Sequence, residues 1–311
     1  MLQNCLGWII MLKTSLSPEV MNMLTKETFH DMLSAGPLLL DGATGSNLMR
    51  AGMPQGCCAE EWILAHPEAL VALQRRYAQA GSRIIYAPTF QAQPIALERV
   101  NLQRQTEAVN AHLVALSRSA APDCLIAGDL TTLAAFLESW DEANMDVMVE
   151  NYRRQIRGLI DGGADLLIAE TLMYPTEAEA IFMAAELEGA GAAMYSFTMQ
   201  PDGSLFSGRE AGPILRELEK AGAAATGFNC VAADMMTPYL VSKLCRYVKG
   251  PLICKPNAGN PVIGEDKLAH YSMTPEEFSD IVVQCAHNGA QLLGGCCGTA
   301  PEFIAAVKDK L

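Results

Sequence analysis

Basic residues are scarce in this sequence. Its 311 residues contain 22 Lys and Arg against 35 Asp and Glu, which gives a formal net charge of −13 at pH 7. An acidic protein repels the phosphates of nucleic acids, and the acidic residues here are spread along the chain without forming a tail. We therefore expect no nucleic-acid partner.

Long apolar runs are also lacking, since no stretch reaches the ~20 residues that a membrane-spanning helix needs. Residues 6–12 are briefly apolar, but no basic residue precedes them, as one would in a signal peptide. The ten cysteines do not have the spacing of a small disulfide framework. These features predict no membrane partner and a protein of the reducing cytoplasm. Residues 1–24, which contain several alternative Met starts, are expected to be a disordered N-terminal extension.

Half of the residues are hydrophobic, and eight short apolar segments are predicted as buried strands. Most of them are continuous apolar runs without alternation, which is typical of parallel strands covered on both faces. The predicted strands are Leu38–Asp41, Arg83–Tyr86, Cys124–Ala127, Asp165–Ala169, Met194–Phe197, Thr226–Asn229, Leu252–Lys255 and Gln291–Gly294.

Stretches with helical spacing of apolar residues separate most of these strands. They are Pro67–Ala80, Val147–Ile160, Thr176–Leu187, Pro213–Ala221, Met235–Val248, Pro275–His287 and Pro301–Leu311. A doubly wound sheet is one arrangement of such units. Eight units favour a (β/α)₈ TIM barrel, which typically needs roughly 250 residues, and we expect residues 25–311 to form it as one domain. Residues 131–145 and 257–273 are predicted as long loops at its active-site end.

Three cysteines follow two of the predicted strands. Cys230 comes directly after one strand, and Cys296 and Cys297 follow the last. In a barrel, residues at these strand ends meet around the active site. Three thiolates can bind zinc in tetrahedral geometry and leave its fourth position to a substrate.

The adjacent pair Cys296-Cys297 has other interpretations, because neighbouring side chains on a strand point in opposite directions. The pair could form a vicinal disulfide or remain two buried thiols. The flanking glycines Gly294, Gly295 and Gly298 favour the metal site, since they let the backbone turn both sulfurs to one side.

Further polar residues stand at other strand ends. Asp41 opens a turn of small residues, 42–45, whose free N–H groups suit a carboxylate, although the turn lacks the lysine of a phosphate-binding loop. Asp41 itself could take a cation. Glu170 ends an apolar run and needs a positive partner, which could be a ligand ammonium or an arginine. A ligand with a carboxylate, an ammonium and a thiol is a thiol amino acid.

These motifs resemble the homocysteine S-methyltransferase family over residues from about 36 to 311. The matching segments are Asp41–Gly45, His66–Glu68, Pro88–Phe90, Ala169–Leu172, Gly227–Cys230, Lys255–Gly259 and Gly294–Thr299. The family includes the homocysteine module of cobalamin-dependent methionine synthase, betaine–homocysteine methyltransferase and S-methylmethionine-dependent enzymes. The resemblance implies a (β/α)₈ barrel, in agreement with the strand count.

The resemblance also implies the roles of individual residues. Cys230, Cys296 and Cys297 would bind zinc, which removes the proton of the homocysteine thiol and makes it a nucleophile. Asp41 and Glu170 would hold the substrate ammonium, and the N–H groups around 42–45 its carboxylate. The asparagine that matches Asn257 approaches zinc in the cobalamin-dependent branch. The substrate-binding residues are thus Asp41, Gly42, Ala43, Thr44, Gly45, Glu170 and Asn257.

The methyl donor is inferred from two segments. Betaine enzymes have an aromatic residue where this chain has Thr171, so betaine is disfavoured. The stretch Lys255–Gly259 is similar to the methionine synthase branch, and these residues include no corrinoid module. We therefore expect a separate methyl-corrinoid protein carrying methylcobalamin, with S-methylmethionine or S-adenosylmethionine as the alternative. Asp129 departs from the Gly-Ser-x-Gly-Pro turn of many relatives, so the acceptor could be an analogue of homocysteine.

Two other classes of protein compete with this interpretation. A zinc hydrolase would need histidine or carboxylate ligands and a base, but the five histidines fall mainly in predicted helices or loops. A non-catalytic zinc-binding subunit would need a fourth protein ligand to close the metal site.

Overall fold

The computed structural model describes residues 23–137, 144–265 and 269–311. Residues 1–22 of the predicted disordered extension, 1–24, lie outside the described residues. Each of the eight predicted strands is present. They are β1 (Leu38–Leu39), β2 (Ile84–Tyr86), β3 (Leu125–Thr131), β4 (Leu166–Leu172), β5 (Ala193–Phe197), β6 (Ala225–Ala232), β7 (Leu252–Asn257) and β10 (Leu292–Leu293).

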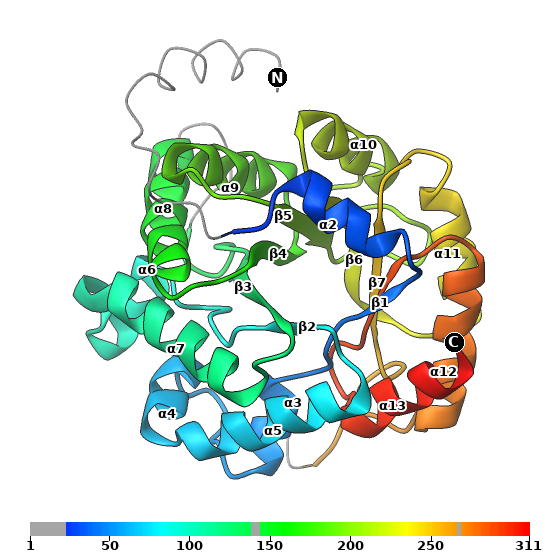
Figure 1. Cartoon of the computed structure of the whole chain (residues 1–311), viewed down its shortest axis with the longest axis horizontal. Helices are drawn as coiled ribbons and strands as arrows, with labels where there is room; N and C mark the ends of the chain where they lie inside the picture. Colours follow the sequence, from blue (N-terminus) through cyan, green and yellow to red (C-terminus); the bar gives the residue numbers. More distant parts are fainter. Residues whose placement is uncertain (1–22, 138–143, 266–268) are drawn as a thin grey trace.

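These strands form one parallel sheet in the order β1-β10-β7-β6-β5-β4-β3-β2. A parallel bridge between Leu40 and Ile84 joins the first strand to the second, and the Arg83 N–H donates to the Leu39 carbonyl at 2.7 Å. The sheet is thereby closed into a ring that helices surround (Figure 1). The predicted (β/α)₈ TIM barrel is confirmed.

The main helices follow their strands. They are α2 (Lys26–Leu33), α3 (Gly45–Arg50), α4 (Ala59–Ala65), α5 (Pro67–Ala80), α6 (Pro94–Leu97), α7 (Thr106–Ala120), α8 (Met145–Asp161), α9 (Pro175–Glu188), α10 (Ala211–Ala221), α11 (Thr237–Leu244), α12 (Pro275–His287) and α13 (Pro301–Lys310). Helix α7 is absent from the sequence prediction. Its buried face includes the polar residues Asn110 and Ser117, which interrupt the apolar pattern.

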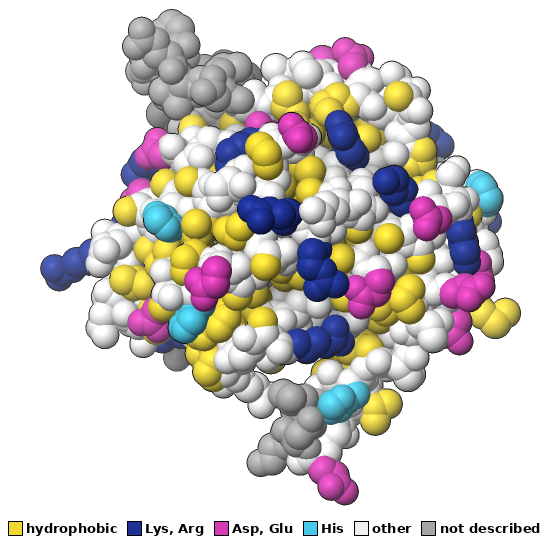
Figure 2. All heavy atoms as spheres, turned by 60° about the horizontal axis from the view of Figure 1, so that its bottom comes forward, with side chains coloured by type: hydrophobic (Ala, Val, Ile, Leu, Met, Phe, Trp, Pro, Cys, Tyr) yellow, Lys and Arg dark blue, Asp and Glu magenta, His cyan; other side chains and the backbone are white. Residues whose placement is uncertain are grey.

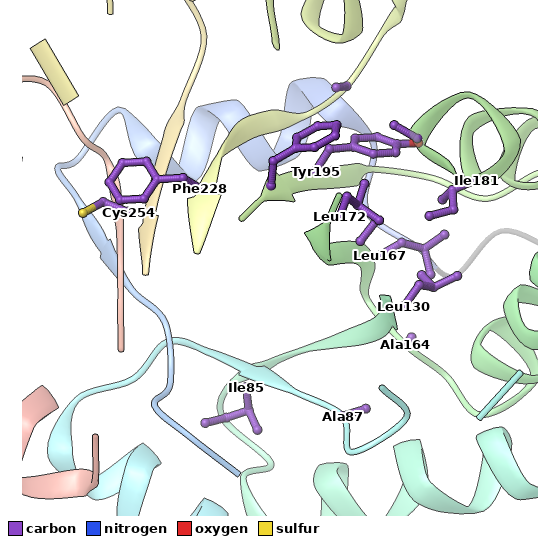
Figure 3. Close-up of a cluster of buried hydrophobic side chains, with 14 of the residues drawn as sticks. Ile85, Ala87, Leu130, Ala164, Leu167, Leu172, Ile181, Tyr195, Phe228 and Cys254 are labelled. Atoms are coloured by element: carbon purple, nitrogen blue, oxygen red, sulfur yellow. The ribbon is translucent and has the colours of Figure 1, made fainter. Parts of the chain in front are cut away.

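Alternate strand residues belong to two different cores. The outer core lies between strands and helices and includes Ile85, Leu167, Tyr195 and Phe228 (Figure 3). The inner core fills the barrel. Its residues on the strands and at their bounds include Leu40, Ile84, Ala127, Leu166, Ile168, Met194, Ala225, Ile253 and Leu292. Because both faces are buried, the strands lack an apolar–polar alternation in the sequence.

Helix α2 covers one end of the inner core and crosses the front of the barrel in Figure 1. Its Phe29 and Leu33 pack into the interior with the inward strand residues. The segment before it is held by two backbone bonds of 2.7 Å, from Leu24 N–H to the Asp165 carbonyl and from Ala192 N–H to the Leu24 carbonyl. This end of the barrel is therefore closed, and the site must open at the other end.

The predicted loop 257–273 contains a short antiparallel ladder, β8 (Val262–Ile263) with β9 (Ala269–His270). It follows β7 at the C-terminal end of the barrel strands. In the other predicted loop, β3 extends to Thr131 and α8 begins at Met145, and residues 138–143 lie outside the described part. None of the helices in the described ranges has the length and apolarity that crossing a membrane requires.

Replacing Phe29 by Ala should lower the free energy of unfolding by about 3–5 kcal/mol, because the substitution leaves a cavity where α2 closes the barrel. Urea unfolding followed by circular dichroism measures this change. Phe206, whose side chain is 53% exposed, provides the control, and Phe206→Ala should change stability by less than ~0.5 kcal/mol. Equal effects of the two variants would contradict the proposed role of α2.

Candidate active site

The structure brings the three predicted cysteines together. Cys230 lies in β6, and Cys296 and Cys297 follow β10, which is separated from β6 in the sheet only by β7. Their sulfur atoms all lie within 4.8 Å of one another, and Cys230 Sγ is 3.9 Å from Cys297 Sγ. Sulfurs placed tetrahedrally at ~2.3 Å from zinc would be about 3.8 Å apart. The three thiols are free, so the trio fits a metal ion and the pair forms no vicinal disulfide.

Irregularities in the strand geometry orient these cysteines. Asn229 occupies an inward position, so simple alternation would turn Cys230 outward. Instead, Cys230 has a left-handed backbone with φ +57°, and the register of β6 with β7 shifts between Asn229 and Ala232. Such a bulge redirects the side chain, and left-handed backbone is costly for a residue other than glycine.

The turn at the adjacent pair Cys296-Cys297 depends on Gly298. This glycine has φ +83°, and a Cβ atom there would lie 2.3 Å from the ring of Tyr271. Tyr271 comes from the segment after β9 and lines the same cavity as the cysteines. The glycine therefore lets the chain reverse beside Cys297 while the aromatic ring packs against it.

The thiols share their charge unequally. Hydrogen bonds with Cys296 and Cys297 raise the pKa of Cys230, because each further thiolate would repel its neighbours. Hydrogen bonds from Cys230 and Cys296 lower the pKa of Cys297 to about 3. Three thiolates side by side require a cation, and a soft divalent metal is the cation that sulfur ligands select.

A layer of polar residues lies next to the cysteine trio, above the inner core. Each stands two residues beyond an inward position of its strand and therefore also points into the barrel. The layer consists of Asp129 on β3, Glu170 on β4, Ser196 on β5, Asn229 on β6 and Lys255 on β7. The sequence prediction assigned only Glu170 among them. Counting in steps of two from the apolar segments would have found the others.

Lys255 is the central cation of this layer. Its Nζ lies 3.5 Å from Asp41 Oδ1, 3.8 Å from Glu170 Oε2 and 4.7 Å from the ring centroid of Tyr86. Burial opposes the ammonium, but the charges of Glu170 and Asp41 outweigh burial and raise the pKa of Lys255 well above its usual value. Of the two partners considered for Glu170, a ligand ammonium or an arginine, the arginine is not found, and the positive partner within the described protein is Lys255.

Three buried carboxylates, Asp129 and Glu170 of the layer and Asp41 after β1, outnumber this lysine. Burial raises the pKa of Asp41 to about 7 and that of Glu170 to about 7, and it raises the pKa of Asp129 well above its usual range. Asp41 Oδ2 accepts the Tyr86 N–H at 2.8 Å. Asp41 Oδ1 and Asp129 Oδ1 are buried and have no hydrogen-bond partner among the described residues. The layer is therefore suited to receive a further positive group.

Asn229 links the polar layer to the cysteines. Its Oδ1 accepts the Thr171 N–H at 2.8 Å and the Ser196 hydroxyl at 2.9 Å. Its Nδ2 donates to Thr171 Oγ1 at 2.7 Å and to Glu170 Oε2 at 3.3 Å, and lies 3.9 Å from Cys296 Sγ. Thr171 also has a left-handed backbone, with φ +60°. The Asn229 side chain bonds both the N–H and the hydroxyl of Thr171 and thereby supports this strained position.

The turn after β1 lines the cavity with Gly42, Ala43, Thr44 and Gly45. Position 42 has no room for a side chain, since a Cβ there would lie 2.6 Å from the Tyr77 hydroxyl and 2.8 Å from Thr299 Oγ1. The Ala43 N–H already donates to Thr299 Oγ1 at 3.1 Å. A substrate carboxylate would therefore rely on the other N–H groups of the turn.

Asn257 differs from the other predicted site residues. It is buried at the end of β7, its Oδ1 has no hydrogen-bond partner in the described part of the chain, and it is not among the residues that line the cavity. The adjacent Ala258 N–H donates to the Cys297 carbonyl at 2.9 Å. The segment thus supports the cysteine turn through its backbone.

The cysteines and the polar layer line one cavity of about 620 Å³. Its remaining wall is largely apolar and includes Met49, Ile63, Pro88 and Phe90. This volume lies in the range of cavities that hold drug-sized ligands. It leaves room for a second reactant beside a small amino acid.

The fold and the thiol-lined cavity define the class of protein. The sequence model of the family described as homocysteine S-methyltransferase matches residues 38–311. The chain therefore belongs to the homocysteine S-methyltransferase family, and it has the fold of a methyltransferase of that family.

Several relatives can be named. A protein of Escherichia coli named homocysteine S-methyltransferase is 28% identical over 296 residues, which cover 88% of this chain and 94% of that protein. Methionine synthase of Mycobacterium tuberculosis is 26% identical over 297 residues, which cover 89% of this chain but only 25% of that protein. The crystal structure of the E. coli homocysteine methyltransferase MmuM in its metallated form has a TM-score of 0.79 at 26% identity and covers 91% of this chain and 99% of that chain.

Replacing Asn229 by Ala should weaken zinc binding by about 10- to 100-fold, because the variant loses the support of the Thr171 backbone and the contact to Cys296. Competition with a chromophoric chelator measures the affinity. Asn151 offers a matched control, since its side chain bonds the Ile95 N–H at 2.9 Å away from the cysteines. An Asn229→Ala affinity equal to that of Asn151→Ala would exclude the supporting role.

Proposed function

We propose that the protein is a zinc-dependent homocysteine S-methyltransferase that forms methionine. The observation that carries this proposal is the convergence of Cys230, Cys296 and Cys297 beside a cavity with buried carboxylates. The crystal structure of MmuM in a metallated form, which has a TM-score of 0.79 to this chain, supports the proposal that the chain binds a metal. The reducing cytoplasm, where thiols stay free, is the compartment that we propose.

The cysteine trio would hold zinc, which supplies a Lewis acid that keeps the acceptor sulfur as a thiolate at neutral pH. The protein residues then fix the acceptor. The buried carboxylates that line the cavity, Asp41, Asp129 and Glu170, attract its ammonium. The free N–H groups of residues 42–45 bind its carboxylate. Asn257 contacts the acceptor from the end of β7, next to the turn of Cys296 and Cys297.

The methyl group is transferred by direct displacement. The acceptor sulfur forms a bond to the methyl carbon, and the methyl carbon loses its bond to the donor, which keeps the electron pair. The apolar wall, which includes Met49, Ile63 and Phe90, would keep water away from this reaction.

We further propose that the donor is a methyl-corrinoid carried by a separate protein. The loops that follow the barrel strands expose large apolar side chains, of which Met235 is 92% exposed. The others are Phe206, Met236, Val262 and Ile263, together with Tyr239 in the first turn of α11. Exposed apolar residues on these loops suit contact with a protein partner better than capture of a small donor. Figure 2 shows one face of the molecule, on which apolar side chains and side chains of both charges are intermixed.

The Cys296→Ala variant should lose both stoichiometric zinc and methionine formation, because two thiolates no longer complete the three-sulfur site. Zinc is measured by atomic emission and methionine by mass spectrometry. Cys57→Ala is the matched control and should keep both, since Cys57 lies outside the cavity lining. Unchanged activity in Cys296→Ala would remove the proposed mechanism. Zinc binding by the wild type without methionine formation from any donor would favour a non-catalytic zinc-binding subunit.

The donor is identified by assaying methionine formation with methylcobalamin, S-methylmethionine and S-adenosylmethionine side by side. We expect turnover with methylcobalamin and little or none with the two sulfonium compounds. Turnover with a sulfonium compound alone would overturn the corrinoid assignment and leave the thiol methyltransferase activity in place.

A further inference from the structure

Three buried carboxylates in the cavity face a single buried ammonium. Asp41, Asp129 and Glu170 line the cavity, and Lys255 is the buried cation among them. The other basic side chains of the described cavity lining are Arg50 and His270, and both residues are exposed. The buried part of the cavity therefore carries more negative than positive charge, and no buried side chain of the described lining balances the excess.

Lys255 already occupies the space between two of the three carboxylates. Its Nζ lies 3.5 Å from Asp41 Oδ1 and 3.8 Å from Glu170 Oε2. A second ammonium placed between the same two groups would meet Lys255 at short range, and the repulsion is strong in a buried site. These two carboxylates are thus engaged within the protein.

Asp129 is the carboxylate that remains. Only 4% of its surface is exposed, and no ion pair within 4.0 Å joins it to a described cation. Its Oδ1 has no hydrogen-bond partner among the described residues, although the carboxylate borders the cavity. Its contacts to side chains use its backbone: the Asp129 carbonyl accepts from the Thr89 hydroxyl at 2.8 Å and from Gln155 Nε2 at 3.2 Å, and its N–H donates to Thr89 Oγ1 at 3.0 Å. A buried carboxylate without a partner indicates a position that a ligand donor fills.

The register of the sheet places Asp129 deeper than Glu170. Asp129 pairs with Ile168 of β4, two residues before Glu170, which pairs with Thr131. A group bound at Asp129 therefore lies at the bottom of the cavity, on the strands across from the cysteines of β6 and β10. An acceptor could extend from this point toward the sulfur cluster.

We propose that Asp129 receives the ammonium of the acceptor and makes the site selective for thiols that carry an amino group, while Lys255 holds Asp41 and Glu170. This inference rests on the proposed function, since it assumes that a thiol acceptor enters the cavity. It assigns to Asp129 a contact that would otherwise fall to Asp41 or Glu170.

The test compares two acceptors that differ only in the amino group, L-homocysteine and 4-sulfanylbutanoic acid. Their affinities for zinc-loaded protein are measured by titration calorimetry for the wild type, Asp129→Asn and Asp41→Asn. We expect Asp129→Asn to weaken L-homocysteine binding by at least ~10-fold, the effect of losing a hydrogen-bonded charge. Binding of 4-sulfanylbutanoic acid should stay nearly the same, because this thiol offers nothing to Asp129.

Zinc content and the unfolding midpoint show that each variant is folded. Asp41→Asn should change the affinities of both thiols to a similar extent, since Asp41 is paired with Lys255. The inference is overturned if Asp129→Asn binds L-homocysteine as the wild type does, if it weakens both thiols equally, or if Asp41→Asn alone removes the preference for the amino group. A zinc-loaded wild type that binds neither thiol would instead refute the proposed function.

Discussion

In a closed barrel of parallel strands, every second residue must point into an interior that is too narrow for water and must be filled by side chains. Apolar residues fill it up to the level of Ile168 and Ile253. Two residues further along the same strands, the inward positions are Glu170 and Lys255. The rest of the site depends on this constraint, because it forces ionisable groups from different strands into one buried layer.

Two breaks in the regular alternation turn this layer into a site. At Cys230 and at Thr171 the backbone is left-handed, and the register of each strand with its neighbour shifts at the same place. Without the break at Cys230, its sulfur would face the helices and the trio could not form. Asn229 makes hydrogen bonds at both breaks, so the strain at the metal site and the order of the acidic layer are coupled.

The charges of the site explain why it needs partners. Three neighbouring thiols resist full ionisation. Asp41 and Glu170 share the ammonium of Lys255, which leaves the buried Asp129 carboxylate without an ion pair to a described cation. In the proposed mechanism a divalent cation would balance the thiolates, and the ammonium of an acceptor would balance the remaining carboxylate. The binding of metal and acceptor would then relieve electrostatic stress that the fold alone leaves in place.

The amino-acid sequence by itself determined the eight strands, the barrel and the cysteine trio, because apolar strand segments and glycine-flanked cysteines are local patterns. It did not reveal α7, where Asn110 and Ser117 interrupt the apolar face. It also left Lys255 and Asp129 without a role. Only the tertiary structure decided which charges meet, because ring closure and strand register bring together side chains that are far apart along the chain, and a buried charge takes its properties from these neighbours.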